Sequence, residues 1–323
     1  MRVVGLFAAT LLFVGCREAA PEPVGADAVV ADDIAVKVMR ALSDDEMAGR
    51  AAGTHGALMG HIYITGMLAN YTHVAKRTER FQAIGVSGES RNIVASLDAD
   101  PTDTGPRLIV TAHYDHLGTR DGEIYNGADD NASGVGAVFA LIEHFGANPP
   151  EHDIDFVFLD AEERGLQGAI AHVQAIGYAE DRPAFNLNLD MVSQNAEGVL
   201  YASGTRHYPE VREVVEALPP VAGVSLRFGH DDPAEGINDW TFQSDHAAFH
   251  RAGIPYLYLG VEDHPHYHKP TDEFATIPLE AYSRFVEQIV VIAEALDARL
   301  DELARTGEPP APPEPDVEPE TAE

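Results

Sequence analysis

Several side chains capable of acid–base chemistry and metal binding stand directly after short apolar runs of the sequence. Each run is typical of a buried strand, and the carboxyl ends of the strands in an open α/β sheet form the edge where ligands bind. We therefore expect these side chains to meet at one sheet edge. They are His113 and Asp115 after residues 108–111, Glu162 and Glu163 after residues 154–160, and Asp190 after residues 185–189.

Two further polar clusters are expected near the same edge. Taken alone, each has an ordinary explanation, such as a helix N-cap for Asp130 or Asn131 or a solvated loop for the histidines. A shared site explains their coincidence better than a set of unrelated caps and surface charges does. The clusters are Asp129, Asp130 and Asn131 before a helix beginning near Ala132, and His264, His266 and His268 in a loop after residues 256–259.

The chemistry that this set of residues favours is hydrolysis at a pair of divalent cations. Imidazole nitrogen together with carboxylate oxygen suits zinc and selects against magnesium and calcium. A carboxylate shared by two cations about 3.5–4 Å apart would balance their charge. The residue types alone leave open whether Asp129 or Asp130 is the shared one.

Two of these residues have expected roles beside the cations rather than on them. Asp115 lies two residues after His113, on the same face of the strand, and can accept the second ring N–H of that imidazole. Glu162 and Glu163 are adjacent and point in different directions, so one can bind metal while the other stays free as a base.

Short β-type runs alternate with helical patterns along the chain, which predicts an α/β fold. We expect a mostly parallel, mixed central sheet with helices on both faces and the metal site at the carboxyl ends of the strands. The expected strands include residues 108–110, 154–159, 185–189 and 256–259, and the expected helices are 34–42, 57–70, 135–145, 166–176, 208–218 and 279–303.

The composition indicates a folded, strongly acidic protein. Of the 323 residues, 45% are hydrophobic, which excludes disorder throughout the chain. The 53 acidic residues outnumber the 21 Lys and Arg residues and give a formal charge of -32. Such a surface repels phosphate backbones, so we expect no nucleic-acid partner.

The two ends of the sequence differ from its middle. Residues 1–15 have the charged start and short apolar run of a signal peptide, and residues 13–16 resemble a lipoprotein signal with Cys16 as the acylated residue. We expect a tether over residues 16–32, a catalytic domain over residues 33–305 and a disordered Pro/Glu-rich tail over residues 306–323. The protein would then be exported to the cell envelope and would contact the membrane only through a lipid at Cys16.

The ordered set of polar motifs resembles the M28 family of zinc aminopeptidases, in a compact bacterial form without a protease-associated domain. Any single motif is weak evidence, but all of them in this order are specific. The matching stretches are TAHYDH at 111–116, GADDNASG at 127–134, DAEERGL at 160–166, NLDM at 188–191, SDH at 244–246 and YHKPTD at 267–272.

The resemblance implies a role for each matching residue. Asp130 would bridge two zinc ions, His113 and Asp190 would complete one zinc site, and Glu163 and His268 would complete the other. Glu162 matches the general base, and Tyr267 matches a tyrosine that binds the developing oxyanion in some members. The family pattern gives no ligand role to His116, Asp245, His246, His264 or His266.

The expected activity is the release of N-terminal residues from peptides that have a free N-terminus. Two alternatives stay open on the sequence: glutaminyl-peptide cyclotransferase, which shares much of the constellation, and a metal-binding relative without catalysis. Such inactive relatives usually lose ligands, whereas every ligand position is filled in this chain.

Overall fold

The computed structural model describes residues 33–99, 105–176 and 182–306. The predicted signal peptide, Cys16, the tether and nearly all of the predicted tail lie outside the described residues. Among the described helices, none combines the length and the apolar character that a membrane crossing would need.

A mixed central sheet dominates the described part of the chain, and eight strands form it in the order β1-β2-β6-β3-β7-β10-β8-β9. The neighbours β6, β3, β7 and β10 run parallel, whereas β1 and β2 extend the sheet antiparallel at one edge and β8 pairs antiparallel with β10. This architecture confirms the predicted fold class. The strands are β1 Ala75–Phe81, β2 Ser90–Leu97, β3 Arg107–His113, β6 Asp153–Leu159, β7 Ala184–Leu189, β8 Val199–Ser203, β9 Ser225–Phe228 and β10 Tyr256–Gly260.

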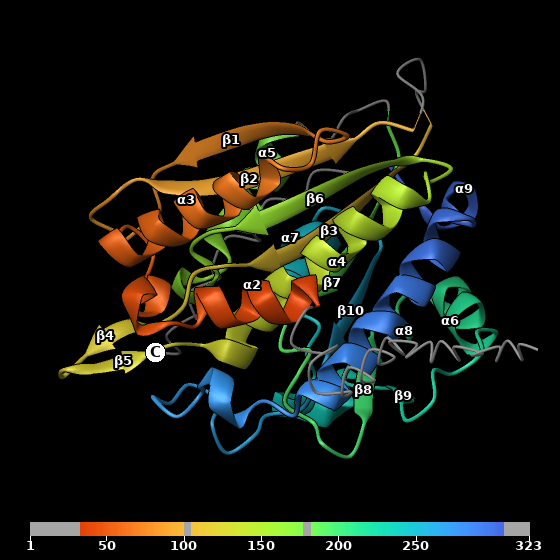
Figure 1. Cartoon of the computed structure of the whole chain (residues 1–323). Helices are drawn as coiled ribbons and strands as arrows, with labels where there is room; N and C mark the ends of the chain where they lie inside the picture. The colour runs from red at the N-terminus through yellow and green to blue at the C-terminus, as the bar shows by residue number, and fades with distance from the viewer. Residues whose placement is uncertain (1–32, 100–104, 177–181, 307–323) are drawn as a thin grey trace, which may run out of the picture.

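Helices cover both faces of the sheet. Figure 1 shows α2, α3, α4 and α8 in front of the sheet and α5 and α7 behind it. Helix α6 packs beside α8, and a small hairpin of β4 and β5 lies at the opposite side of the molecule in Figure 1. The bounds are α2 Ile34–Leu42, α3 His55–Leu68, α4 Gly134–Ala147, α5 Gln167–Ala175, α6 Pro209–Glu216, α7 His246–Arg251, α8 Leu279–Asp297, α9 Leu300–Leu303, β4 Gly118–Arg120 and β5 Glu123–Tyr125.

Strand β6 shows why this sheet must be covered twice. Every residue of β6 is buried. Phe156 and Phe158 belong to the apolar cluster on the α4 face, whereas Val157 and Leu159 belong to the cluster on the α5 face. Because successive side chains of a strand point to opposite faces, an apolar run of this kind needs a helical layer on each side.

The central strand β3 lies at a change of direction in the chain path. From β3 the chain passes through α4 to β6 on one side, and it later adds β7 on the other side of β3. Connections that leave in opposite directions open a crevice at the carboxyl ends of the strands. The functional residues of β3, β6 and β7 therefore face one crevice.

A buried arginine ties the N-terminal segment to the loops around this crevice. Arg50 has no exposed surface, and its guanidinium donates to the backbone carbonyls of Tyr114 at 2.7 Å, Asn126 at 2.6 Å and Gly127 at 3.0 Å, and also to that of Leu42. Burial lowers the pKa of Arg50 to about 10, so the side chain remains a cation at neutral pH. One charged group thus satisfies carbonyls from separate loops.

Replacing this arginine should destabilise the whole domain. Arg50→Met keeps most of the side-chain volume but leaves buried carbonyls without donors, so we expect the free energy of unfolding to fall by about 3 kcal/mol or more. Urea denaturation followed by circular dichroism measures the change. Arg80→Met, at an exposed arginine paired with Glu89 at 2.9 Å, is the control and should cost less than about 1 kcal/mol. Equal losses in the two variants would contradict this role of Arg50.

Candidate metal centre

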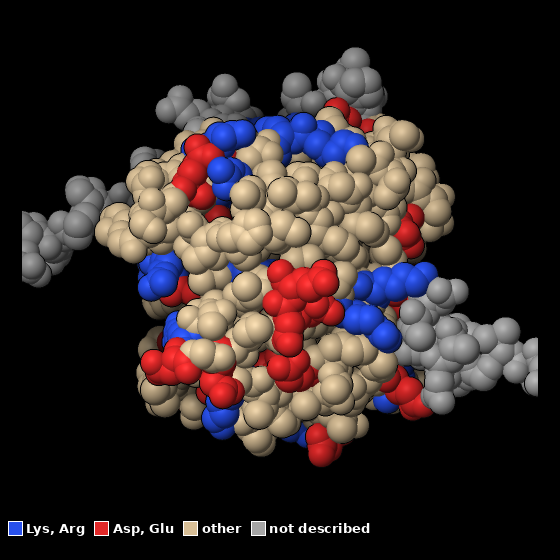
Figure 2. Space-filling view, turned by 60° about the vertical axis from the view of Figure 1, so that its left-hand side comes forward, with Lys and Arg blue, Asp and Glu red and all other residues tan. Residues whose placement is uncertain are grey.

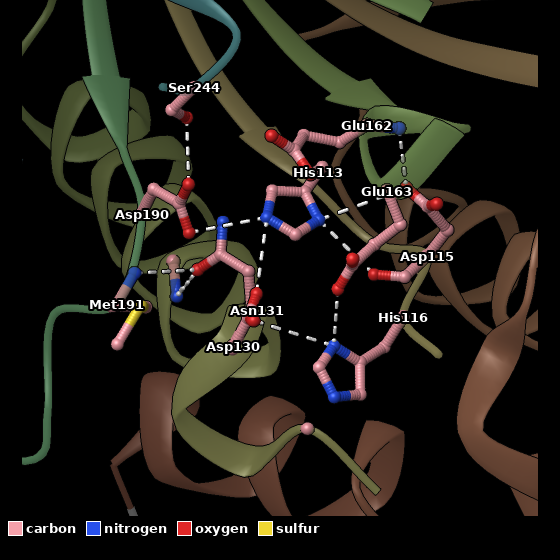
Figure 3. A network of polar contacts seen from close by, with 12 residues as sticks. His113, Asp115, His116, Asp130, Asn131, Glu162, Glu163, Asp190, Met191 and Ser244 are labelled. Atoms are coloured by element: carbon pink, nitrogen blue, oxygen red, sulfur yellow. Dashed lines mark hydrogen bonds and ion pairs between the residues drawn. The ribbon is translucent and has the colours of Figure 1, made fainter. Parts of the chain in front are cut away.

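All of the residues predicted to bind metal meet at the carboxyl edge of the sheet. They come from separate elements of the fold. Figure 3 shows His113, Asp130, Glu163 and Asp190 turned toward one another. His113 ends β3, Asp190 follows β7, Glu163 lies in the turn Glu162–Arg164 after β6, Asp130 lies in the turn Ala128–Ser133 before α4, and His268 lies in the loop after β10.

The first group of donors gathers around the ring of His113. Its Nε2 lies 3.2 Å from Asp190 Oδ1 and 3.4 Å from Asp130 Oδ1. Ligand atoms arranged tetrahedrally around zinc, at bond lengths of about 2.0–2.1 Å, are separated by about 3.3 Å. The observed separations therefore fit three ligands of one cation.

The second group shares Asp130 with the first. Asp130 Oδ2 lies 3.1 Å from His268 Nε2, and Glu163 Oε1 lies 3.5 Å from the same nitrogen. Asp130 thus directs one carboxylate oxygen to each group, which is the geometry of a bridging ligand. Glu163 Oε1 is buried and has no hydrogen-bond partner among the described residues, which also fits a ligand atom.

The neighbouring Asp129 faces away from both groups. Its Oδ1 accepts hydrogen bonds from the backbone N–H of Ser193 at 2.8 Å and from the Ser193 hydroxyl at 2.6 Å. Its Oδ2 lies 3.1 Å from His264 Nε2. The choice that the residue types left open therefore has a structural answer, since only Asp130 points into the centre.

Backbone contacts hold the Asp130 turn in place. Asp272 accepts hydrogen bonds from the N–H groups of Asp129 and Asp130, each at 3.0 Å. Asn131 donates to the carbonyl of Leu189 at 2.9 Å, which joins this turn to the end of β7. The peptide bond between Asp130 and Asn131 is cis. Asp272 belongs to the motif at 267–272, but its positioning role was not predicted from the sequence.

Asp115 supports the site, although through different atoms than expected. The Nδ1 of His113 lies 3.1 Å from the backbone carbonyl of Asp115 and 3.7 Å from its carboxylate. The Asp115 carboxylate instead accepts the backbone N–H of Glu162 at 3.0 Å. The main chain of Asp115 therefore orients His113, while its side chain fixes the turn that carries Glu162.

The adjacent glutamates have opposite electrostatic surroundings. Burial raises the pKa of the Glu162 carboxyl well above its usual range. Burial also acts to raise the pKa of Glu163, but His116 and His268 outweigh it and hold that pKa well below its usual range. Glu163 is therefore held as an anion, whereas Glu162 readily takes up a proton, and this difference suits the predicted ligand and base.

A pocket of about 450 Å³ opens beside the metal centre. This volume is typical of sites for small ligands. Tyr267 lies on the wall of the pocket and stacks on the ring of His268, with centroids 4.0 Å apart. The pocket is lined by His113, Asp130, Glu162, Glu163, Gly165, Leu166, Asp190, Met191, Phe242, Gln243, Arg251, Tyr267 and His268.

The charged groups around the pocket are mostly acidic, as they are in the chain as a whole. Figure 2 shows acidic and basic side chains interspersed on one face of the molecule, with a cluster of acidic side chains near its middle. Arg251 lies among the pocket residues and over the ring of Phe242, at 4.9 Å from its centroid. The pocket is therefore predominantly acidic, with Arg251 as the basic group at its wall.

The remaining histidines and acids of the sequence motifs have varied surroundings. His116 is buried, with Nδ1 2.9 Å from Glu163, although sequence reasoning gave it no ligand role. Its position three residues after His113, in a turn at the strand end, was the available signal. Asp245 is fully buried, which raises its pKa to about 7. His266 is paired with Thr271 at 3.0 Å, at the exposed side of the loop.

Comparison with known proteins gives one family match. Residues 92–293 match peptidase family M28. Aminopeptidase YwaD of Bacillus subtilis is 30% identical over 185 residues, which make up 54% of this chain and 37% of that protein. The matched part is thus well under half the length of that relative.

Solved structures show the same fold. A zinc aminopeptidase of Bacillus subtilis has a TM-score of 0.66 at 16% identity and covers 80% of this chain and 94% of its own. A glutaminyl cyclase of Bacteroides thetaiotaomicron, bound to N-acetylhistamine, has a TM-score of 0.64 at 20% identity, with 80% and 96% covered. At such identities, the likeness establishes architecture only.

Substitution of the shared aspartate should empty both cation positions. Asp130→Asn keeps the side-chain size but removes the charge that both groups use, so we expect fewer than one zinc per chain after dialysis. Mass spectrometry of the metal content measures this. The neighbouring variant Asp129→Asn is the matched control, because Asp129 faces Ser193 and His264; it should lower stability and keep zinc. Full zinc occupancy in Asp130→Asn would exclude the bridging geometry.

Proposed function

The chain belongs to peptidase family M28, and we propose that it is an aminopeptidase that uses two zinc ions to release N-terminal residues from peptides. The observation that carries the proposal is the Asp130 carboxylate, which turns one oxygen to His113 and the other to His268. A centre for a single cation would not need a carboxylate directed at two groups of donors. The filled ligand set also argues against a relative that has lost catalysis.

The residues present fit zinc, and each position has named holders. His113, Asp190 and Asp130 would hold one ion, and Asp130, Glu163 and His268 the other. Bound zinc would polarise the scissile carbonyl and lower the pKa of the attacking water. The protein would hold these ligands rigidly through Asp272 and Asp115, so that little reorganisation accompanies the reaction.

Glu162 is placed to carry the proton through the reaction. It lines the pocket, and its carboxylate lies within 4.8 Å of the ligand atoms of His113 and Asp190. As general base it would take the proton from the attacking water, and as general acid it would return that proton to the leaving amine. The raised pKa of Glu162 favours this second step.

Tyr267 is the candidate for stabilising the oxyanion. Its ring lies on the pocket wall beside His268, so its hydroxyl can reach a bound substrate. A hydrogen bond to the charge that develops on the carbonyl oxygen would lower the barrier. Substrates would be peptides with a free N-terminus, because the acidic groups of the pocket attract an ammonium group.

The cellular site is proposed from the sequence alone. Residues 1–15 have the pattern of a signal peptide, and Cys16 lies where a lipid would be attached. Export to the cell envelope would place the enzyme among peptides outside the cytoplasm.

Removal of the proposed base should stop turnover without loss of metal. Glu162→Gln keeps the size of the side chain but cannot accept a proton, so we expect kcat to fall about 100-fold to 10,000-fold. Hydrolysis of an aminoacyl fluorogenic substrate gives the rate, and metal analysis should still find two zinc ions per chain. A near-normal kcat would refute the base assignment, and a parallel loss of zinc would make Glu162 a ligand.

The products formed from a Gln-initiated peptide distinguish hydrolysis from cyclisation. A glutaminyl cyclase is among the structural relatives, so this alternative is specific. We expect free glutamine and the shortened peptide by mass spectrometry, with loss of activity on chelation and its return with added zinc. Loss of ammonia from an otherwise intact peptide would instead identify a cyclotransferase.

A further inference from the structure

His116 is a fully buried imidazole directed into the metal centre. The residue follows β3 by three positions, and Figure 3 shows the Nδ1 side of its ring facing Glu163 and Asp130. Gly127 packs directly against this ring: a Cβ added at Gly127, whose φ is +58°, would lie 2.6 Å from the imidazole. The backbone at Gly127 therefore packs tightly against the ring of His116, a residue outside the predicted set of ligands.

The distances place His116 among the donors of the second cation position. Its Nδ1 lies 2.9 Å from Glu163 Oε1 and 3.6 Å from Asp130 Oδ2. The predicted ligand His268 lies at comparable distances from the same oxygens, 3.1 Å from Asp130 and 3.5 Å from Glu163. For both imidazoles, the distances from the ring nitrogen to the carboxylate oxygens are close to the separation of about 3.3 Å expected between two ligands of one zinc ion.

The contact between His116 Nδ1 and Glu163 Oε1 is short but poorly aligned for a hydrogen bond. Neither His116 Nδ1 nor Glu163 Oε1 has an aligned hydrogen-bond partner among the described residues, despite their 2.9 Å separation. His172 offers the contrast, because its Nδ1 also lies 2.9 Å from a glutamate oxygen, that of Glu79, and there the hydrogen bond is aligned. The ring of His116 therefore meets the Glu163 oxygen in a geometry less suited to a hydrogen bond than that of the His172–Glu79 pair.

Burial makes such a ring costly unless something binds it. Within the described part of the chain, His116 Nε2 also has no hydrogen-bond partner. A buried polar nitrogen without a partner costs about 1–3 kcal/mol. A cation held between Glu163, Asp130 and His268 would remove this cost at Nδ1.

We propose that His116 is a further ligand of the second cation, which it binds through Nδ1. The proposal rests on the two-cation centre described above and adds a third imidazole to it. The second cation would then have four protein donors, whereas the first would have three and keep more open coordination. Donation by a further neutral nitrogen strengthens retention and weakens Lewis acidity, so the second cation would act mainly to hold Asp130 and the first mainly to polarise substrate.

Zinc affinity of a matched pair of variants tests the assignment. His116→Asn keeps a polar atom near the position of Nδ1, so a mere hydrogen bond to Glu163 would survive while a good zinc ligand is lost. We expect its weaker zinc site to lose at least about 10-fold in affinity, measured by competition with a chromophoric chelator. The control is His172→Asn, which makes the same change at a buried Nδ1 that pairs with Glu79, outside the metal centre, and should leave both zinc affinities unchanged.

The tautomers of the bound histidines give a second test on the unaltered protein. His113 and His268 approach the carboxylates through Nε2, whereas His116 does so through Nδ1. Nitrogen-15 spectra of zinc-loaded protein should therefore show a metal-bound Nδ1 with its proton on Nε2, in a signal that His116→Asn removes. This readout does not depend on activity or on the stability of the variant.

The outcomes separate this inference from the proposed function. Two zinc ions in the unaltered protein, with wild-type affinity in His116→Asn and no Nδ1-bound imidazole, would overturn the role of His116 alone. Fewer than two zinc ions in the unaltered protein would overturn the proposed two-zinc function as well. Weakened binding of one zinc ion together with the Nδ1 signal supports the assignment.

Discussion

The site depends on balancing the negative charge of several carboxylates that the fold holds close together. Asp130, Glu163 and Asp190 are held close to one another at the carboxyl edge of the sheet, and Glu162 lies beside them. Buried like charges repel strongly, and neighbouring imidazoles alone compensate them only when protonated. Divalent cations would offset this charge and leave the imidazoles neutral as ligands. Without metal, the repulsion between these carboxylates would destabilise the folded state. This repulsion is the main physical argument that the site binds divalent cations.

Side chains around the site form hydrogen bonds with the backbone groups of the turns. The metal-binding carboxylates are therefore not needed as partners for those backbone groups. Asp272 accepts from the turn that carries Asp130, and Asp115 accepts from the turn that carries Glu162. The guanidinium of Arg50 donates hydrogen bonds to the backbone carbonyls of the neighbouring loops. Among the described residues, Glu163 Oε1 is therefore left without a hydrogen-bond donor, and the supported turns cannot relax to supply one.

The sequence predicted the parallel core well because its strands are apolar throughout and short. The leading helix at 34–42 is confirmed with the same bounds, and β3, β6, β7 and β10 match the apolar runs. Strand β1 was not predicted, because its sequence AKRTERF is largely polar and exposed and only pairing with β2 makes it a strand. The predicted helix at 279–303 divides after Asp297, where Arg299 leaves helical geometry.

Sequence reasoning located the site residues but could not assign every atom. Spacing placed Asp115 beside His113 correctly, yet the turn after β3 brings the backbone carbonyl of Asp115, rather than its carboxylate, closer to the ring. The same segment buries His116. The direction of the His116 side chain could not be predicted from its spacing of three residues from His113, because that direction depends on how the chain leaves the strand.

The segment that follows β3 determines which imidazole lies at each of the two proposed cation positions. It delivers one imidazole, His113, to the side shared with Asp190 and another, His116, to the side shared with Glu163. Two donors so close in sequence can serve different cations because the chain leaves the extended strand between them. In the proposed two-zinc centre this geometry would make the pair asymmetric: the position beside Glu162 would have fewer protein donors and would lie next to the proposed proton carrier. The position beside Glu163 is enclosed by nitrogen and oxygen donors and lies next to a carboxylate held as an anion. In the proposed two-zinc centre, chemistry would therefore be favoured on the Glu162 side, and anchoring of the shared Asp130 carboxylate on the Glu163 side.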